Sequence, residues 1–251
     1  MTQQRTLHLI TYAPALAGKD SRTVDVIHGM ENALPGLHLA WRLSAGGRPI
    51  PLPQRDAWLL DNIEDGGFPI VCNGDKSYPV TVSGMEKSGL FTAGGQPQFE
   101  VHAEMPLDEP AIAAAAAVLE AVAEGARAFW GRATPDAAAV DIAYQTAPTL
   151  QGPPSPRRGL PALKLPQHSR SPEIPRYLGW LNFWSAAAAK AIGFPDLTHD
   201  AELLTRARRT PSGGWVVQLT EAPLDLDNPA HLDALKRAYE RFPAIGGRAA
   251  Q

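Results

Sequence analysis

The stretch from Gln98 to Phe129, QFEVHAEMPLDEPAIAAAAAVLEAVAEGARAF, decides the fold class of this chain. Its first eight residues alternate between polar and apolar side chains, which is typical of a strand with one buried face. Asp108 then supplies a capping carboxylate before a segment with apolar residues at helical spacing. The apolar stripe consists of Ile112, Ala115, Leu119, Val122, Ala126 and Phe129. A strand that leads into an amphipathic helix predicts helices packed against a sheet.

The rest of the chain shows the same two kinds of pattern. Apolar runs and alternation predict strands at 7–11, 37–43, 68–72, 78–83, 140–144 and 215–219. Helical spacing with start and stop signals predicts helices at 21–34, 186–193, 201–208 and 229–242. Together these elements predict an α+β fold with mixed or antiparallel sheets and packed helices.

Residues 101–108 and 217–225 resemble each other, because each leads from an expected strand towards an expected helix through Pro-Leu-Asp. Proline leaves the sheet and aspartate begins a helix, so the similarity can be ordinary strand-to-helix chemistry. The alternative is a duplicated strand–helix unit, packed as two related lobes. Either explanation gives the same fold class.

A proline-rich segment divides the chain. Residues 148–175 hold eight of the 24 prolines, a density that leaves no room for regular structure. The segment is also basic: residues 151–176 carry a formal charge of +4, so the rest of the chain carries −7 of the total of −3. We therefore expect an N-terminal α+β lobe at 1–147, a connector at 148–176 and a C-terminal α+β lobe at 177–251, which can also pack as one domain.

Composition narrows the class of protein. With 251 residues, 44% hydrophobic and 20% charged, the chain can bury a core of its own. A single cysteine excludes a disulfide framework, and the net negative charge argues against direct nucleic-acid binding. The longest nearly apolar run, 111–118, is far too short for a membrane span, and the first residues lack the pattern of a signal peptide. We expect a cytoplasmic protein.

Motifs of known chemistry are missing from the sequence. There is no P-loop, no dinucleotide fingerprint, no H-E-x-x-H and no G-x-S-x-G. His102-Ala103-Glu104 matches half of a zinc-deaminase motif, but the other half needs two cysteines and the chain has only Cys72. A solvated strand face explains the first motif, and a buried structural thiol explains the cysteine. The sequence thus predicts no catalytic, metal-binding or cofactor-binding residue and favours a protein that is not an enzyme.

Carboxylates and tryptophans are the remaining candidates. Acidic loops on an acidic body can dock a basic partner, although solvated loops are the simpler interpretation. Two tryptophans four residues apart can anchor an interface, although core packing is the simpler interpretation. The candidate partner-binding residues are Asp61, Glu64, Asp65, Glu221, Asp225, Asp227, Trp180 and Trp184.

Three segments of the second half carry a family resemblance. Residues 178–185, LGWLNFWS, resemble a block of the immunity protein 52 family of bacterial polymorphic toxin systems. Residues 214–220, GWVVQLT, and the helix start Asn-Pro-Ala-His at 228–231 resemble that family's closing strand and last helix. Over its whole length the chain also resembles an uncharacterised family defined by a domain of unknown function.

The first resemblance implies an α+β antidote that binds and blocks a cognate toxin encoded beside it. The toxin's effector domain would be a nuclease with a basic cleft, which the acidic protein would occlude. Trp180, Phe183 and Trp215 would be framework residues of the family.

Two other functions stay open at this point. The chain could be a hydrolase-like enzyme that uses Cys72 or the carboxylates of 61–65, which requires a deep pocket with perturbed titratable groups. It could also be a structural or regulatory subunit anchored through Trp180 and Trp184, which requires a large exposed apolar patch.

Overall fold

The computed structural model describes residues 5–63, 66–148 and 152–248. The strands are β1 Thr6–Pro14, β2 Trp41–Leu43, β3 Pro49–Pro51, β4 Phe68–Cys72, β5 Thr81–Lys87, β6 Gln98–Pro106, β7 Trp130–Pro135, β8 Leu181–Trp184, β9 Ala207–Arg209 and β10 Trp215–Gln218. The α-helices are α1 Arg22–Ala33, α2 Arg55–Asp61, α3 Glu109–Ala126, α4 Asp136–Thr146, α5 Ala186–Ile192, α6 Ala201–Leu204 and α7 Pro229–Arg241. Four 3-10 turns are η1 Gly89–Phe91, η2 Ala93–Gly95, η3 Pro166–His168 and η4 Ile245–Gly247.

The ten strands form one sheet in the order β3-β2-β4-β5-β6-β1-β7-β8-β10-β9, and neighbouring strands run antiparallel. The α+β class with an antiparallel sheet and packed helices is thereby confirmed. Strands β1–β7 come from the first part of the chain and β8–β10 from the second, joined where β8 pairs with β7. Both parts therefore contribute to the same sheet.

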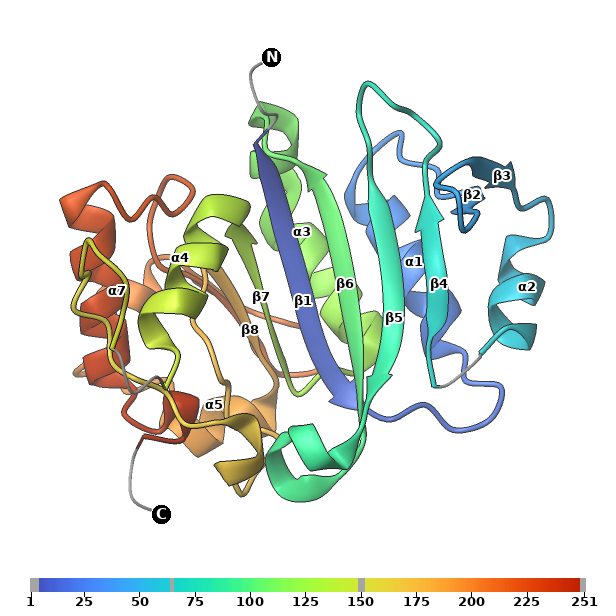
Figure 1. Cartoon of the computed structure of the whole chain (residues 1–251). Helices are drawn as coiled ribbons and strands as arrows, with labels where there is room; N and C mark the ends of the chain where they lie inside the picture. The colour runs from blue at the N-terminus through green and yellow to red at the C-terminus, as the bar shows by residue number, and fades with distance from the viewer. Residues whose placement is uncertain (1–4, 64–65, 149–151, 249–251) are drawn as a thin grey trace.

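One face of the sheet is covered by α1 and α3 (Figure 1). Leu7, Leu9 and Ala13 of β1 are buried there beside the apolar residues of β6, as their alternation requires. The two helices approach closely at glycines: a Cβ on Gly29 would lie 2.9 Å from the Ala121 carbonyl oxygen. The alanine-rich sequence of α3 permits this packing, and this layer is the main core.

The opposite face is only partly covered. Helix α4, helix α7 and the segment 152–180 lie over the strands near β7 and β8, whereas β4, β5 and the second half of β6 are open on this side (Figure 1). His8, Ile10 and Tyr12 of β1 alternate with the core residues and turn to this face. The boundary between the covered and open halves follows β1.

Several predicted elements are confirmed. Asp108 caps α3, because its Oδ1 accepts a hydrogen bond of 3.0 Å from the Ala111 N–H. Asn228 caps α7 by accepting from the Ala230 N–H at 3.0 Å. Cys72 is a free, buried thiol, as expected.

The prediction of a strand at 140–144 is wrong, because these residues belong to α4. Val140 and Tyr144 are exposed, whereas Ala138 and Ile142 are buried one helical turn apart. The strand of this region is β7, ten residues earlier. Its Gly131 permits close contact with β1, since a Cβ there would lie 2.8 Å from Thr11 Cγ2. The expected strand at 37–43 is shortened to β2.

None of the helices in the three described ranges combines the length and apolar character needed to cross a membrane.

Candidate functional site

Two recesses lie at opposite ends of β1. The first adjoins the start of the strand and is an open groove of about 510 Å³. The second adjoins Tyr12 near the end of the strand and is a smaller pocket of about 140 Å³. We call them the acidic groove and the arginine pocket.

Carboxylates from two distant segments line the acidic groove. Asp136 and Asp141 come from α4, and Asp225 and Asp227 come from the loop that precedes α7. The cations in its lining are Arg5 and Arg158, which leaves a formal excess of two negative charges.

Arg158 connects the two sides of the groove. Its Nε lies 3.0 Å from Asp141 Oδ2, and its Nη2 lies 2.6 Å from Asp227 Oδ1. The hydrogen bond to Asp227, helped by the charge of Asp141, raises the pKa of the Arg158 guanidinium. A second contact places His8 Nε2 3.3 Å from Asp136 Oδ1. The groove is thus a network of partly exposed charges rather than a buried catalytic centre.

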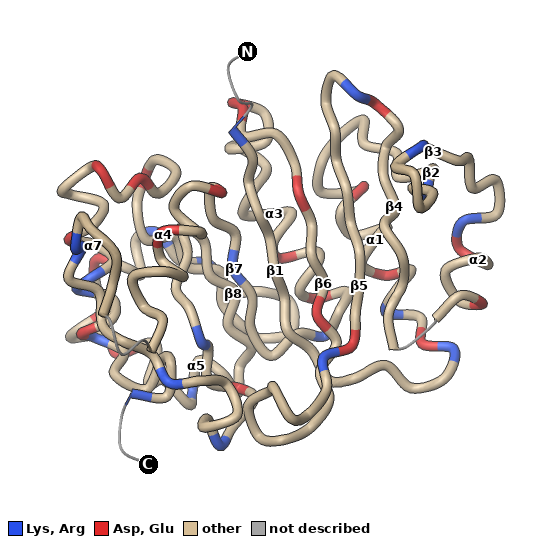
Figure 2. The backbone as a smooth tube through the Cα atoms, in the orientation of Figure 1, with Lys and Arg blue, Asp and Glu red and all other residues tan. Residues whose placement is uncertain are grey.

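The predicted acidic residues separate in space. Asp225 and Asp227 line the groove, and Glu221 is exposed just before that loop. Asp61 ends α2 near the β2–β3 edge, at the opposite end of the molecule from α7 (Figures 1 and 2), and it pairs with Lys19 at 2.5 Å. Glu64 and Asp65 lie outside the described residues. The two acidic loops therefore do not form one surface.

The two candidate tryptophans belong to the core. Trp180 is 2% exposed and Trp184 is 0% exposed. The Trp180 Nε1–H donates to the Thr220 carbonyl oxygen at 2.9 Å, and the Trp184 ring packs edge-on against Phe194 and Phe242. The expectation that they anchor a partner is corrected by this burial, because neither indole reaches the surface.

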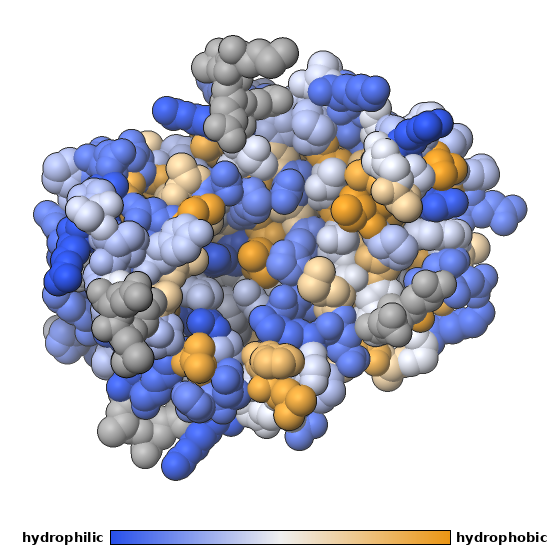
Figure 3. All heavy atoms as spheres, viewed as in Figure 1, coloured by the Kyte–Doolittle hydropathy of each residue, from blue (hydrophilic) through white to orange (hydrophobic). Residues whose placement is uncertain are grey.

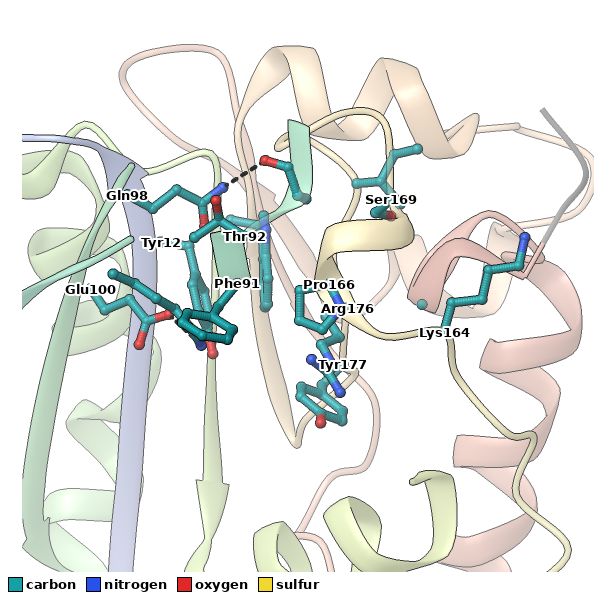
Figure 4. Close-up of a pocket in the computed structure, with 15 residues that line it drawn as sticks. Tyr12, Phe91, Thr92, Gln98, Glu100, Lys164, Pro166, Ser169, Arg176 and Tyr177 are labelled. Carbon is teal, nitrogen blue, oxygen red and sulfur yellow. Dashed lines mark hydrogen bonds and ion pairs between the residues drawn. The ribbon is translucent and has the colours of Figure 1, made fainter. Parts of the chain in front are cut away.

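The arginine pocket lies between the sheet and the connector. Figure 4 shows Tyr12, Phe91 and Glu100 on the sheet side and Pro166, Arg176 and Tyr177 on the connector side. The Tyr12 and Trp130 rings stack with centroids 4.0 Å apart. Across the pocket, the Arg176 guanidinium carbon lies 4.9 Å from the centre of the Tyr177 ring.

Burial and charge shift two groups of this pocket. Burial, reinforced by the nearby Glu100 carboxylate, raises the pKa of Tyr12 well above its ordinary value, so its hydroxyl stays protonated. Burial also acts to raise the pKa of Glu100, but hydrogen bonds with His102 and Lys87 outweigh it and the net shift is downward. Glu100 is 3.1 Å from Lys87 Nζ and 3.3 Å from His102 Nε2, so it is an ionised, paired carboxylate.

Sequence reasoning missed half of the groove and most of the pocket. Asp136 and Asp141 were not predicted as part of a site, because the sequence did not predict helix α4. Glu100 lies on the same face of the strand as His102 and Glu104, a face expected to be solvated, but the turns η1 and η2 and the connector cover it. The signal available in the sequence was the cluster of positive charge in the connector, which includes Arg176, but it was not connected with a pocket.

No three His, Cys, Asp or Glu side chains of the described chain are grouped so that they could hold a metal ion. On the face in Figure 3, hydrophobic residues form small groups among hydrophilic ones.

Comparison with solved structures finds a similar fold in the Pseudomonas aeruginosa T6SS protein PA0821. The TM-score is 0.56 with 14% sequence identity, covering 95% of this chain and 76% of that one. A comparison with curated proteins gives no significant match. The resemblance to the immunity protein 52 family stays a prediction, whereas the resemblance to a family of unknown function is confirmed. The model of the domain of unknown function DUF5953 matches residues 18–250, and the chain belongs to that family.

Proposed function

We propose that this protein is an immunity protein, which binds a cognate toxin and blocks it by covering its active surface. The observation that carries the proposal is the acidic groove. Two segments about ninety positions apart in the sequence, at 136–141 and 225–227, bring four carboxylates to one open recess. Such a recess suits a protein partner with a basic surface.

The negative charge of the groove indicates what kind of partner it can bind. A nuclease holds nucleic-acid phosphates with Lys and Arg side chains, and carboxylates can take the place of those phosphates. Charge complementarity of this kind raises the association rate and selects the partner. We therefore propose a basic nuclease domain as the toxin.

Two further observations support the proposal. The segments that resemble the immunity family pack together: Trp215 of β10 pairs with Trp184 of β8, and the Trp184 ring contacts Phe242 after α7. This packing supports the resemblance, which would make these segments the framework of the family. The likeness in fold to a T6SS protein is compatible with a toxin system as the setting.

The alternatives receive less support from the described residues. Cys72 is buried in β4, and Asp61 is paired with Lys19 on the surface, so neither forms a reactive centre with a neighbouring base. A subunit anchored through Trp180 and Trp184 would need indoles at the surface, and both are buried.

The test is co-expression with the toxin encoded by the neighbouring gene. The wild-type protein should restore growth and form a one-to-one complex. The double variant Asp136→Lys/Asp225→Lys should lose protection, because it reverses the charge of the groove. Asp61→Lys makes the same kind of change at the far end of the molecule and should protect fully. A neighbouring gene product that is harmless and does not bind, or equal protection by both variants, would overturn the proposal.

A further inference from the structure

Two arginines beside the arginine pocket have buried nitrogen atoms without hydrogen-bond partners. Arg132 of β7 is only 7% exposed, and its Nη1 has no acceptor. The Nε of Arg176 is also buried without one. Within the described residues, neither guanidinium forms an ion pair.

This arrangement is unfavourable for the folded protein by itself. A buried donor without an acceptor loses its hydration without replacement, and the loss is larger for a charged group. Glu100 does not compensate, because its two oxygens face Lys87 and His102. The two guanidinium groups instead lie 4.8 and 4.9 Å from the centre of the Tyr177 ring, which offers a weaker cation–π interaction.

The same two arginines adjoin aromatic walls. Tyr177 lines the pocket together with the stacked Tyr12–Trp130 pair, and Phe91, which is 58% exposed, stands beside it. Flat apolar rings and a planar guanidinium fork suit different parts of one ligand. Rings suit a flat apolar body, and the fork suits a carboxylate or phosphate group.

The volume limits the size of the ligand. The pocket's 140 Å³ is about ten times the space that one water molecule needs. It can admit an oxyanion group together with a single ring, and it is too small for a nucleotide or a peptide segment.

We propose that the arginine pocket binds a small aromatic oxyanion, with its carboxylate or phosphate on Arg176, which lines the pocket, and its ring against the aromatic walls. Arg132 contacts the lining residue Tyr177 and adds positive charge beside the pocket. This site is separate from the acidic groove and goes beyond the proposed toxin binding. Its test uses the isolated protein without any toxin, so the two proposals fail independently.

The experiment is calorimetric titration of the full chain with phenyl phosphate and benzoate. At least one should bind, and which one is tighter identifies the oxyanion. Inorganic phosphate, which lacks the ring, and benzyl alcohol, which lacks the charge, should each bind at least about tenfold more weakly, because each lacks one set of contacts.

Two variants assign the binding to the pocket. Arg176→Gln should weaken binding of phenyl phosphate or benzoate about tenfold or more, since it removes a charge-assisted hydrogen bond. Arg48→Gln is the matched control, because Arg48 is exposed in the turn between β2 and β3, and it should change affinity less than twofold. If Arg176→Gln fails to fold, the comparison of the four ligands on the wild-type protein carries the test alone.

Three results would overturn the proposal. They are absence of binding by both aromatic anions at millimolar concentration, equal binding of benzyl alcohol or inorganic phosphate, and equal losses in the control and the pocket variant.

Discussion

Arg22 at the start of α1 and Arg132 at the arginine pocket are both buried, with 5% and 7% of their surface exposed, yet their surroundings differ completely. Arg22 donates to the Asp20 carboxylate and to the carbonyl oxygens of Pro14, Ala15 and Ala126 at 2.7–3.3 Å. Arg132 has no side-chain hydrogen bond to the described residues, and its guanidinium lies against the Tyr177 ring.

The difference indicates what each arginine does. Arg22 ties the end of β1, the turn before α1 and the end of α3 together, so its partners belong to the fold. Arg132 has no side-chain hydrogen bond to the described residues, so it does not tie neighbouring segments together as Arg22 does. A buried cation that the described residues leave unpaired calls for an explanation, and the ligand proposed for the neighbouring pocket offers one.

The largest effect is expected for Arg22→Ala. The substitution leaves Asp20 and three backbone carbonyls without their donor, so we expect a loss of about 3–5 kcal/mol in the free energy of unfolding. Urea unfolding followed by circular dichroism measures it. A loss below about 1 kcal/mol would show that Arg22 does not hold these segments together.

The next largest effect is expected on the stability of the protein at low pH. The hydrogen bonds from Arg22 lower the pKa of Asp20 below its ordinary value of 3.8. Because the folded-state pKa is lower than the unfolded one, the stabilisation is present above pH 3.8 and is lost as pH falls through the folded-state value.

Asp20→Asn should therefore be less stable than wild type at pH 6, and the difference should shrink towards pH 2. The midpoints of urea unfolding across this pH range measure the difference. Glu221→Gln is the control, because it removes one carboxylate at an exposed position. A constant difference between Asp20→Asn and wild type would contradict the linkage.

Local chemistry explains which elements could be predicted from the sequence. The caps Asp108 and Asn228 and the alternation of β6 act within a few residues, and all are confirmed. In residues 136–146, Val140, Ile142 and Tyr144 alternate as in a strand, whereas the many alanines favour a helix. The sequence therefore carries signals for both structures. In the structure the segment is a helix that buries Ile142 and exposes Val140 and Tyr144. Which of these side chains is buried depends on the strands that the segment packs against, and these are not visible in the local sequence.

The sites depend on contacts between distant segments. Asp225 and Asp227 were predicted as a cluster, but the groove also needs α4, ninety residues earlier. Arg132 would have attracted attention as a charge on the covered face of a strand if 130–135 had been recognised as β7. Gly131 and Pro135 concealed that strand, because glycine and proline just after a helical pattern indicate the end of a helix.

A third arginine, Arg158, differs from both Arg22 and Arg132. Arg158 is held between Asp141 and Asp227 in the acidic groove, where its charge offsets theirs. Arg158→Gln should make the groove more negative and speed association with a basic toxin, on the order of two- to fivefold at low salt. Stopped-flow or surface-plasmon measurements check this, and slower association would show that Arg158 helps the partner to bind.

The smallest effect on stability is expected for Arg132→Gln. Loss of the cation–π contact and relief of an unpaired buried charge oppose each other, so the free energy of unfolding should change by no more than about 1 kcal/mol. Urea unfolding beside Arg22→Ala gives the comparison directly. A loss as large as that of Arg22→Ala would make Arg132 a structural residue.

The most direct test of toxin neutralisation through the acidic groove is the association rate constant with the neighbour-encoded toxin at 50 and 500 mM salt. Wild type and Asp61→Lys should associate at similar rates that fall steeply with salt, because opposite charges guide the encounter. Asp136→Lys/Asp225→Lys should associate about tenfold or more slowly at low salt and respond little to salt. Equal rates and equal salt dependence for all three proteins would contradict the account.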